Sequence, residues 1–331
     1  MESGKILKLM KFKLKKIRSD ASFREFFRLY KGKKTSIIVT AKKERFKNLI
    51  AYSAINKFLR INNIYAPNLH VSNFSKGVIV IEDFGDTSFH KILIQKKNKF
   101  TIYKKLVDLL LKIQKIKPKT KIRNIGGGFH VVNKYSSKYL FKESDLFFDW
   151  YLPLFFNKKK VLNIKKKSKK ILLKLYKKLN FPNSYFVHRD YHSQNLMKIK
   201  GKIGVIDSQD ALIGNPAYDL VSLIDDVRIK TSKKLKNKIY SYYLIKNKKN
   251  LKNNTKNFLE YFNILSVQRS LKIIGIFARL FKRDNKDKYL RFIPYTWRML
   301  ELRMKGKIFL ELKKILDENI PKKIRKKNIN K

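Results

Sequence analysis

Residues 185–197 read YFVHRDYHSQNLM, an apolar run, a polar loop and a second apolar run. Apolar runs of this length around a polar loop are typical of short β-strands. A turn at residues 200–204 follows, and the next short apolar run ends at Asp207. Strands joined by a short turn pair as a hairpin, so we expect Asn195 at the start of one strand and Asp207 at the end of the other to lie close together.

The loop before this hairpin matches a catalytic pattern. His188, Arg189, Asp190 and Asn195 follow H-R-D-x-x-x-x-N, the pattern of loops that support phosphoryl transfer. That reaction needs a carboxylate to align the acceptor hydroxyl and Mg2+ to bridge the phosphates. Asp190 would accept the hydroxyl proton, while the amide of Asn195 and the carboxylate of Asp207 are oxygen ligands that suit Mg2+.

An ordinary hairpin with a polar turn is the alternative interpretation of these residues. A lone H-R-D triplet would favour it, but the complete loop, its flanking apolar runs and the strand-end Asp207 together favour catalysis. His188 and His192 have the spacing of zinc ligands on a helix, yet this stretch is typical of a loop and lacks the glutamate of H-E-x-x-H. We interpret both histidines as structural residues of the loop.

The composition of the chain predicts a folded protein with a sizeable core. It has 331 residues, 44% of them hydrophobic and 13% aromatic, enough for one large domain or two lobes. There is no cysteine, which excludes disulfides and thiolate zinc sites and favours a reducing compartment. Residues 1–16 carry Lys in every apolar stretch and no apolar run approaches ~18 residues, so we expect a cytoplasmic protein with no membrane partner.

The charge of the chain has two interpretations. It carries 80 Lys and Arg against 24 Asp and Glu, a formal net charge of +56. Such a field attracts polyanions such as nucleic acid or an anionic membrane surface. The alternative is that Lys, Ile and Asn share AT-rich codons, so that lysine runs such as those at 158–160 and 165–170 are solvated helix faces. We favour the second interpretation, and with no aromatic-interleaved basic motif present we expect no specific nucleic-acid partner.

Hydrophobic periodicity predicts a strand-rich first part and a helix-rich second part. We expect a hairpin from strands 24–30 and 35–40, then a helix from 46 to 58, then a buried strand at 78–81 that runs into a break at 82–86. Further helices are expected around 106–113, 164–179 and much of 240–316. We therefore place a boundary after residue 85, with lobes at 1–85 and 86–331.

The catalytic segment resembles the aminoglycoside phosphotransferase superfamily, which shares the protein-kinase fold and phosphorylates small molecules. Residues 19–28, 204–220 and 268–280 are further similar to the N-acetylmuramate/N-acetylglucosamine anomeric kinases of bacterial cell-wall recycling. The resemblance spans nearly the whole chain. It implies an α+β, protein-kinase-like two-lobed fold, with a small antiparallel-sheet N-terminal lobe that binds nucleotide, a large helical C-terminal lobe for catalysis and acceptor binding, and ATP and Mg2+ as cofactors.

The resemblance also implies a nucleotide-covering loop made of Ser19, Asp20, Ala21 and Ser22, whose backbone N–H groups would cradle phosphate. A simple hairpin turn is the alternative. The phosphate-pairing lysine that such folds carry in the third strand is absent from residues 37–39, which leaves Lys42 or its neighbour just beyond the strand, and the next helix has no glutamate to pair with it.

Glu82 and Asp83 would sit in the hinge, where family members bind adenine through backbone groups while side chains serve structure. Asp219 resembles the buried aspartate that supports the catalytic loop, together with His188 and Arg189. Ser208 replaces the apolar residue that usually follows the metal-binding aspartate, which leaves the packing of that loop open.

The acceptor region is expected around the aromatic cluster at 147–151, since aromatic faces suit a sugar ring and carboxylates can accept hydrogen bonds from its hydroxyl groups. Core packing, or bracing of the lobe, is the alternative for each residue. The candidates are Glu143, Asp145, Trp150, Tyr151 and Arg269.

Three hypotheses follow for function. The leading one is ATP-dependent phosphorylation of the anomeric hydroxyl of N-acetylmuramate or N-acetylglucosamine. A same-fold alternative is a kinase for an aminoglycoside or another amino alcohol such as choline or homoserine, whose cationic acceptor needs an acidic pocket like that offered by residues 143–149. A different class is a basic nucleic-acid-binding protein. The oligomeric state stays open.

Overall fold

The computed structural model describes residues 13–17, 23–42, 47–179, 184–251 and 255–326. It contains two compact units that interleave along the chain. Within the described ranges, the first is built from residues 13–96, 119–133 and 188–211, and the second from residues 97–118, 134–187 and 212–326. The catalytic-loop segment thus packs in the same unit as the N-terminal strands, and a boundary after residue 85 stays a prediction.

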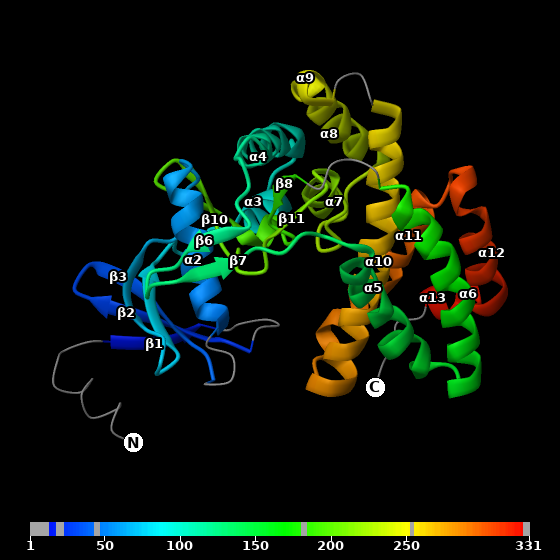
Figure 1. Cartoon of the computed structure of the whole chain (residues 1–331), viewed down its shortest axis with the longest axis horizontal. Coiled ribbons are helices and arrows are strands. Elements are labelled where there is room, and N and C mark those ends of the chain that lie inside the picture. Colours follow the sequence, from blue (N-terminus) through cyan, green and yellow to red (C-terminus); the bar gives the residue numbers. More distant parts are fainter. Residues whose placement is uncertain (1–12, 18–22, 43–46, 180–183, 252–254, 327–331) are drawn as a thin grey trace. The chain divides into compact units, whose positions relative to one another are not determined.

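A five-stranded antiparallel sheet forms the base of the first unit (Figure 1). Its strand order is β1-β2-β3-β5-β4, and each neighbouring pair is antiparallel. The strands are β1 (Lys13–Ile17), β2 (Glu25–Lys31), β3 (Lys34–Thr40), β4 (Leu69–Asn73) and β5 (Val78–Glu82). The hairpin of β2 and β3, the helix that follows it and the strand β5 were all predicted from the sequence.

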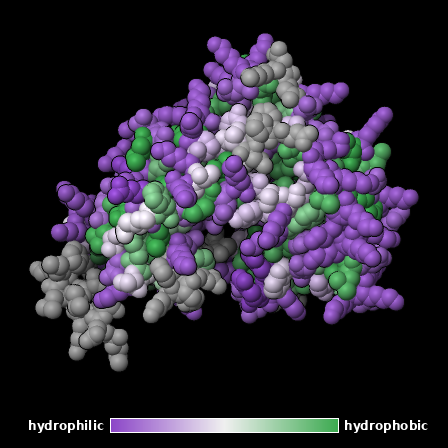
Figure 2. Space-filling view, in the orientation of Figure 1, coloured by the Kyte–Doolittle hydropathy of each residue, from purple (hydrophilic) through white to green (hydrophobic). Residues whose placement is uncertain are grey.

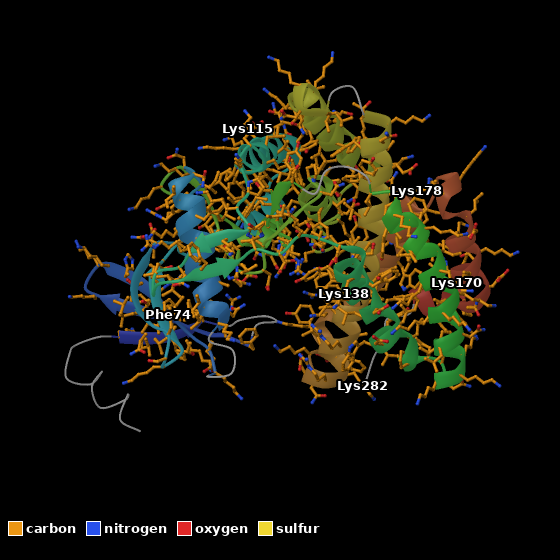
Figure 3. All side chains as sticks on the ribbon, viewed as in Figure 1. Phe74, Lys115, Lys138, Lys170, Lys178 and Lys282 are labelled. Atoms are coloured by element: carbon orange, nitrogen blue, oxygen red, sulfur yellow. The ribbon has the colours of Figure 1, made fainter. Side chains whose placement is uncertain are left out.

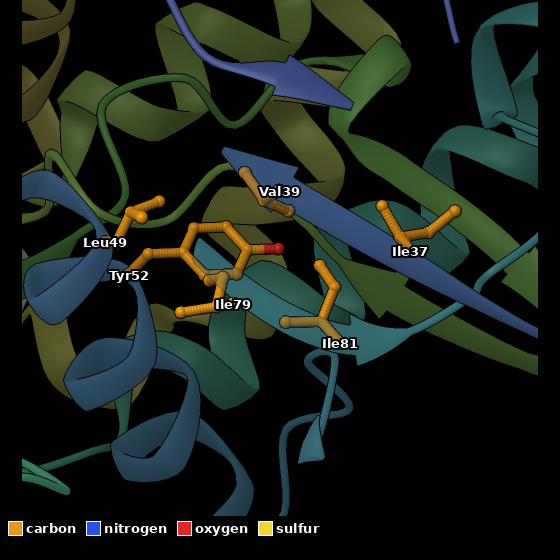
Figure 4. Packing of buried hydrophobic residues seen from close by; sticks show 6 residues of the cluster. All are labelled: Ile37, Val39, Leu49, Tyr52, Ile79 and Ile81. Atoms are coloured by element: carbon orange, nitrogen blue, oxygen red, sulfur yellow. The ribbon is translucent and has the colours of Figure 1, made fainter. Parts of the chain in front are cut away.

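The core of this sheet packs against helix α2 (Lys47–Ile61). Alternation along β3 directs Ile37 and Val39 to the core, where they meet Tyr52 of α2 and two isoleucines of β5 (Figure 4). Leu49 and Tyr52 of α2 belong to this apolar cluster, and further buried residues such as Ile55 and Leu59 follow along the helix. The first unit therefore has an apolar core of its own between the sheet and helix α2.

The catalytic-loop hairpin belongs to this unit as well. Strand β9 (Leu196–Ile199) pairs antiparallel with β10 (Lys202–Val205). Backbone bonds from Val205 to the Tyr65 carbonyl and from Lys198 to the Thr87 carbonyl fix the hairpin to the segments before and after β5. Short helix α3 (Phe89–Gln95) and hairpin β6–β7 (Lys121–Arg123 and Phe129–Val131) complete the unit.

The second unit is mostly helical. Its longest helix, α10 (Thr255–Asp284), packs against α5 (Ser137–Leu146), α7 (Ala217–Ile224) and α11 (Ile293–Arg303). A two-stranded sheet of β8 (Tyr185–Val187) and β11 (Leu212–Gly214) lies in the same unit. Its other α-helices are α4 (Lys99–Gln114), α6 (Lys158–Lys177), α8 (Lys233–Lys246), α9 (Lys248–Leu251), α12 (Leu310–Asn319) and α13 (Lys322–Lys326).

Lysine covers the outer faces of these elements. The view in Figure 2 is dominated by hydrophilic residues, and Figure 3 labels exposed lysines such as Lys115, Lys138 and Lys170. The run at 158–160 is exposed throughout, as expected of a solvated helix face. In the run at 165–170 the lysines are exposed or partly exposed, while Ser168 is buried. Of the helices in the described ranges, none combines the length and apolar character needed to cross a membrane.

Candidate active site

The catalytic loop is held in shape by its own backbone. The carbonyl of Asp190 accepts hydrogen bonds from the His192 amide (2.9 Å) and from Nδ2 of Asn195 (3.0 Å). The Asn195 amide in turn donates to the His192 carbonyl at 2.9 Å. The loop therefore forms a closed turn in which the position of Asp190 depends on Asn195.

Asn195 and Asp207 flank the open end of the β9–β10 hairpin, as the sequence predicted. Leu196 pairs with Val205, and the Ile206 amide donates to the Asn195 carbonyl at 3.0 Å. Because Nδ2 of Asn195 is turned to the backbone, Oδ1 is the amide atom left for a cation. Asp207 adopts φ 65°, a left-handed conformation that is costly for a non-glycine residue and clusters at functional sites.

These ligands fit Mg2+ bound together with a nucleotide. One carboxylate and one amide oxygen are hard ligands, and proteins commonly hold Mg2+ with one or two such groups plus substrate phosphates. The Asp207 side chain is 38% exposed, so one side of its carboxylate faces solvent. The metal-binding roles of both residues remain proposals.

His188 and Arg189 connect the loop to the segment around Asp207. His188 is fully buried, and its Nε2 lies 3.1 Å from the Ile206 carbonyl, an arrangement in which the ring nitrogen donates. Arg189, at φ 74°, donates to the Asp210 carbonyl at 3.2 Å. These contacts fit the predicted supporting roles of the two residues.

The structure shows how Ser208, the residue after Asp207, is packed. Ser208 is fully buried and donates to Oδ1 of Asn56, on α2, at 2.7 Å. The amide of Asn56 also faces the Pro67 carbonyl. A polar link therefore takes the place of an apolar side chain and ties α2 to the loop that carries Asp207.

Ser208→Ala should lower the stability of the protein by about 1–3 kcal/mol, because Oδ1 of buried Asn56 would lose its donor. Thermal unfolding measures this as a fall in Tm. Ser75→Ala is the matched control, since Ser75 makes a similar bond to Asn73 at an exposed turn. Equal Tm changes in the two variants would contradict the assigned link.

The residues predicted to bind the nucleotide stay predictions. Ser19, Asp20, Ala21 and Ser22 lie outside the described residues. Lys42 is exposed just beyond β3. Its role as the phosphate-binding lysine stays a prediction.

The two carboxylates predicted to lie in the hinge are engaged within the protein. Glu82 accepts from the Tyr65 hydroxyl (2.6 Å), and this bond raises the pKa of Tyr65. Asp83 is paired with Arg28 at 2.6 Å. The side chains thus serve structure, which leaves backbone groups of this segment as the candidates for adenine.

The predicted acceptor residues lie in the second unit, where partners within the protein account for several of them. Glu143 is buried and bonded to Lys272 (2.9 Å) and Gln268 (2.9 Å). Tyr151 is buried, accepts from Trp297 and donates to the Ile324 carbonyl. For both residues the geometry favours the packing alternative, and substrate contact stays a prediction.

The other predicted residues of this unit differ in environment. Asp145 pairs with Lys169 at 2.9 Å, and Trp150 is partly exposed on the π-helical turn Phe147–Tyr151. Arg269 donates to the Ser222 hydroxyl at 2.7 Å, which supports bracing of α10 on α7. Asp219 is buried in the first turn of α7, and its support of the catalytic loop stays a prediction.

Arg24 is the residue of the site that sequence reasoning missed. It is buried directly before β2, and its Nη2 lies 2.5 Å from Oδ1 of Asp207, while its Nη1 donates to Oε1 of Gln209 at 3.0 Å. In the sequence, Arg24 appears only as a cation directly before a predicted strand. That pattern does not indicate its partner, because Asp207 lies 183 residues further along the chain.

An antiparallel sheet with a packed helix, followed by an H-R-D loop and a hairpin ending in aspartate, defines the class of kinase-like phosphotransferases. The family model described as "Phosphotransferase enzyme family" matches residues 13–248. The chain belongs to this phosphotransferase family, whose members are ATP-dependent kinases that act on hydroxyl groups of small molecules.

Known proteins similar to this chain agree with the family. An N-acetylmuramate/N-acetylglucosamine kinase of Neisseria meningitidis serogroup B is 29% identical over 279 residues, covering 83% of this chain and 81% of the relative. A kinase of the same name from Pseudomonas aeruginosa is 28% identical and covers 86% and 81%.

Solved structures share the fold at lower identity. An ADP-bound aminoglycoside phosphotransferase superposes with a TM-score of 0.61 at 13% identity, covering 93% of this chain and 98% of its own. A choline kinase from Streptococcus pneumoniae gives 0.61 at 12% identity, covering 91% and 98%. The α+β kinase-like fold predicted from the sequence is confirmed.

Proposed function

We propose that the protein transfers the γ-phosphoryl group of ATP to the anomeric hydroxyl of N-acetylmuramate or N-acetylglucosamine. The observation that carries the proposal is the closed turn at Asp190, joined through Asn195 to the hairpin that ends at Asp207. The names of the curated relatives, which cover more than four fifths of this chain, support the sugar acceptor.

The proposed chemistry divides among three residues. The oxygen of the sugar hydroxyl bonds to the γ-phosphorus, and Asp190 accepts the proton of that hydroxyl. The bond from the γ-phosphorus to the bridging oxygen of ADP breaks. Asn195 and Asp207 would hold Mg2+, which would supply positive charge against the phosphates. The distance between Asp190 and Asn195 is fixed because the side-chain amide of Asn195 donates to the backbone carbonyl of Asp190.

Charge pairing in the predicted acceptor region supports a sugar over a polycation. Glu143 is paired with Lys272, Asp145 with Lys169 and Asp149 with Lys165. A cationic aminoglycoside or amino alcohol would find these carboxylates already neutralised, whereas a neutral or carboxylate-bearing amino sugar needs no surplus negative charge. The amino-alcohol kinase is therefore the weaker of the two same-fold proposals.

Incubating the protein with Mg-ATP and a panel of acceptors tests the proposal. We expect ADP release with N-acetylmuramate and N-acetylglucosamine, and none with the methyl glycoside of N-acetylglucosamine, whose anomeric oxygen is blocked. Turnover of choline or an aminoglycoside, but not of the free sugars, would contradict the sugar assignment. Phosphorylation of the methyl glycoside would contradict the anomeric position.

The nucleic-acid alternative has its own signature. Binding through the +56 net charge would fall steeply with salt and be unaffected by changes at Asp190. Measuring DNA and RNA affinity across a salt series, beside sugar turnover, separates a non-specific electrostatic attraction from the proposed activity.

A further inference from the structure

The third strand offers no cation where kinase-like folds carry one. Ile37 and Val39, the β3 residues directed toward α2, are 8% and 1% exposed and are packed against Tyr52 and the isoleucines of β5 (Figure 4). The face of β3 that a phosphate-binding lysine would occupy is therefore filled by apolar core. Any cation beside Asp207 has to come from another element.

Arg24, directly before β2, supplies a cation at that position. Its side chain is 6% exposed, and its guanidinium donates to Oδ1 of Asp207 and to Oε1 of Gln209. The guanidinium also lies over the rings of Phe26 (5.5 Å) and Tyr52 (5.7 Å), which fix its plane. Arg24 is therefore fixed inside the protein by two aromatic rings and points at a proposed metal ligand, unlike an arginine in a surface ion pair.

Helix α2 is adapted to an arginine instead of a lysine–glutamate pair. Where a glutamate would meet a lysine, α2 presents the ring of Tyr52. Burial raises the pKa of Tyr52 to about 12, so its hydroxyl is neutral at physiological pH. One turn further along the helix, Asn56 holds the loop after Asp207 through Ser208. The missing lysine, the missing glutamate and the unusual Ser208 thus belong to one arrangement around Arg24.

Arginine suits a position between a carboxylate and a phosphate. Its planar fork presents five donors, so it can keep one oxygen partner while it gains another, and it stays charged even when buried. Asp207 has an exposed side for a cation, while Arg24 approaches from the buried side. The two positive charges would then meet the nucleotide phosphates from different directions.

We propose that Arg24 is the phosphate-binding cation of the nucleotide site, in the role that the β3 lysine fills in related folds. The proposal rests on the assigned kinase activity but not on the identity of the acceptor. The guanidinium of Arg24 donates to the phosphates of ATP or ADP whether or not Mg2+ is bound at Asp207.

Nucleotide binding measured by calorimetry without any acceptor tests this. In EDTA, Arg24→Gln should weaken ADP affinity by about 10- to 100-fold, because a charge-assisted contact to phosphate is lost. Adenosine, which has no phosphate, should bind Arg24→Gln as it binds the wild type. Arg24→Lys keeps the charge and should bind ADP with intermediate affinity.

Lys34→Gln, which removes one positive charge from an exposed position on β3, is the matched control and should leave ADP affinity unchanged. If Arg24→Gln binds ADP normally in EDTA and is weaker only with Mg2+, Arg24 merely positions Asp207 and the proposal is overturned. A wild type that binds no ADP would overturn the kinase assignment itself. Failure of the sugar panel alone would leave this inference standing.

A second measurement begins with a variant in which Arg24 is intact, because a buried arginine can be needed for folding. Asp207→Asn removes the carboxylate that competes for the guanidinium, so ADP affinity in EDTA should rise while adenosine affinity stays constant. The rise should disappear in the Arg24→Gln background, a coupling that a double-mutant cycle isolates. An ADP affinity unchanged by Asp207→Asn would overturn the proposal.

Discussion

Asp190→Asn should lower kcat for sugar phosphorylation by about 10²- to 10⁴-fold, the range that a positioned general base contributes. The substitution preserves the shape of the side chain but removes its capacity to accept a proton. The backbone carbonyl of Asp190, which receives bonds from His192 and Asn195, is unaffected, so the loop should keep its conformation. We therefore expect KM for ATP and the Tm to stay close to wild type.

Steady-state kinetics at saturating Mg-ATP, with thermal unfolding alongside, measures this prediction. Asp287→Asn makes the same chemical change at an exposed position and should retain full activity. A variant of Asp190 that keeps more than a tenth of wild-type kcat with unchanged Tm would remove this residue from the role of base. Loss of activity together with a large fall in Tm would instead point to a structural role.

The catalytic hairpin could be predicted from the sequence because its contacts are local. Asp190, Asn195 and Asp207 lie within 18 positions, and the strands β9 and β10 are joined by a tight turn at Lys200 and Gly201. Apolar runs and turn residues are sufficient to predict such pairing. The predicted helix α2 and strand β5 likewise follow from periodicity within a short window.

Strands β1 and β4 could not be predicted in the same way. β1 reads KLKKI and is mostly exposed, and β4 is exposed along most of its length, so neither has the alternation of a half-buried strand. Both lie at the edges of the sheet, and the three lysines of β1 fit an edge position because lysine discourages pairing with further strands. Their structure is determined by the neighbouring strands β2 and β5 rather than by their own composition.

The side-chain contacts around Asp207 and Glu143 also could not be predicted from short stretches of sequence. Ser208 and Asn56 are 152 positions apart, and Lys272 and Glu143 are 129 apart. In the sequence, Glu143 is one carboxylate near an aromatic cluster, a pattern shared by substrate-binding and structural residues. Burial with a lysine partner favours the structural role, since an unpaired buried charge is costly.

Gly275→Ala should destabilise the protein even though alanine is the better helix former. Gly275 lies in the middle of α10, and a Cβ there would overlap the Leu146 carbonyl group and the Phe147 amide nitrogen, where α5 passes into the π-helical turn. Alanine gains about 1 kcal/mol of helix propensity over glycine. Overpacking costs typically 1–3 kcal/mol or more, and backbone atoms cannot rotate aside as a flexible side chain can. Steric overlap should therefore win, by about 2 kcal/mol.

Thermal unfolding should show a fall in Tm of about 3 °C for Gly275→Ala. Gly306→Ala is the control, because a Cβ at Gly306 would meet only ordinary contacts with Phe309 and Ile308, and its Tm should change by about 1 °C at most. A higher Tm for Gly275→Ala would mean that helix propensity outweighs the contact. The close approach of α10 to the end of α5 would then not be what requires a glycine at this position.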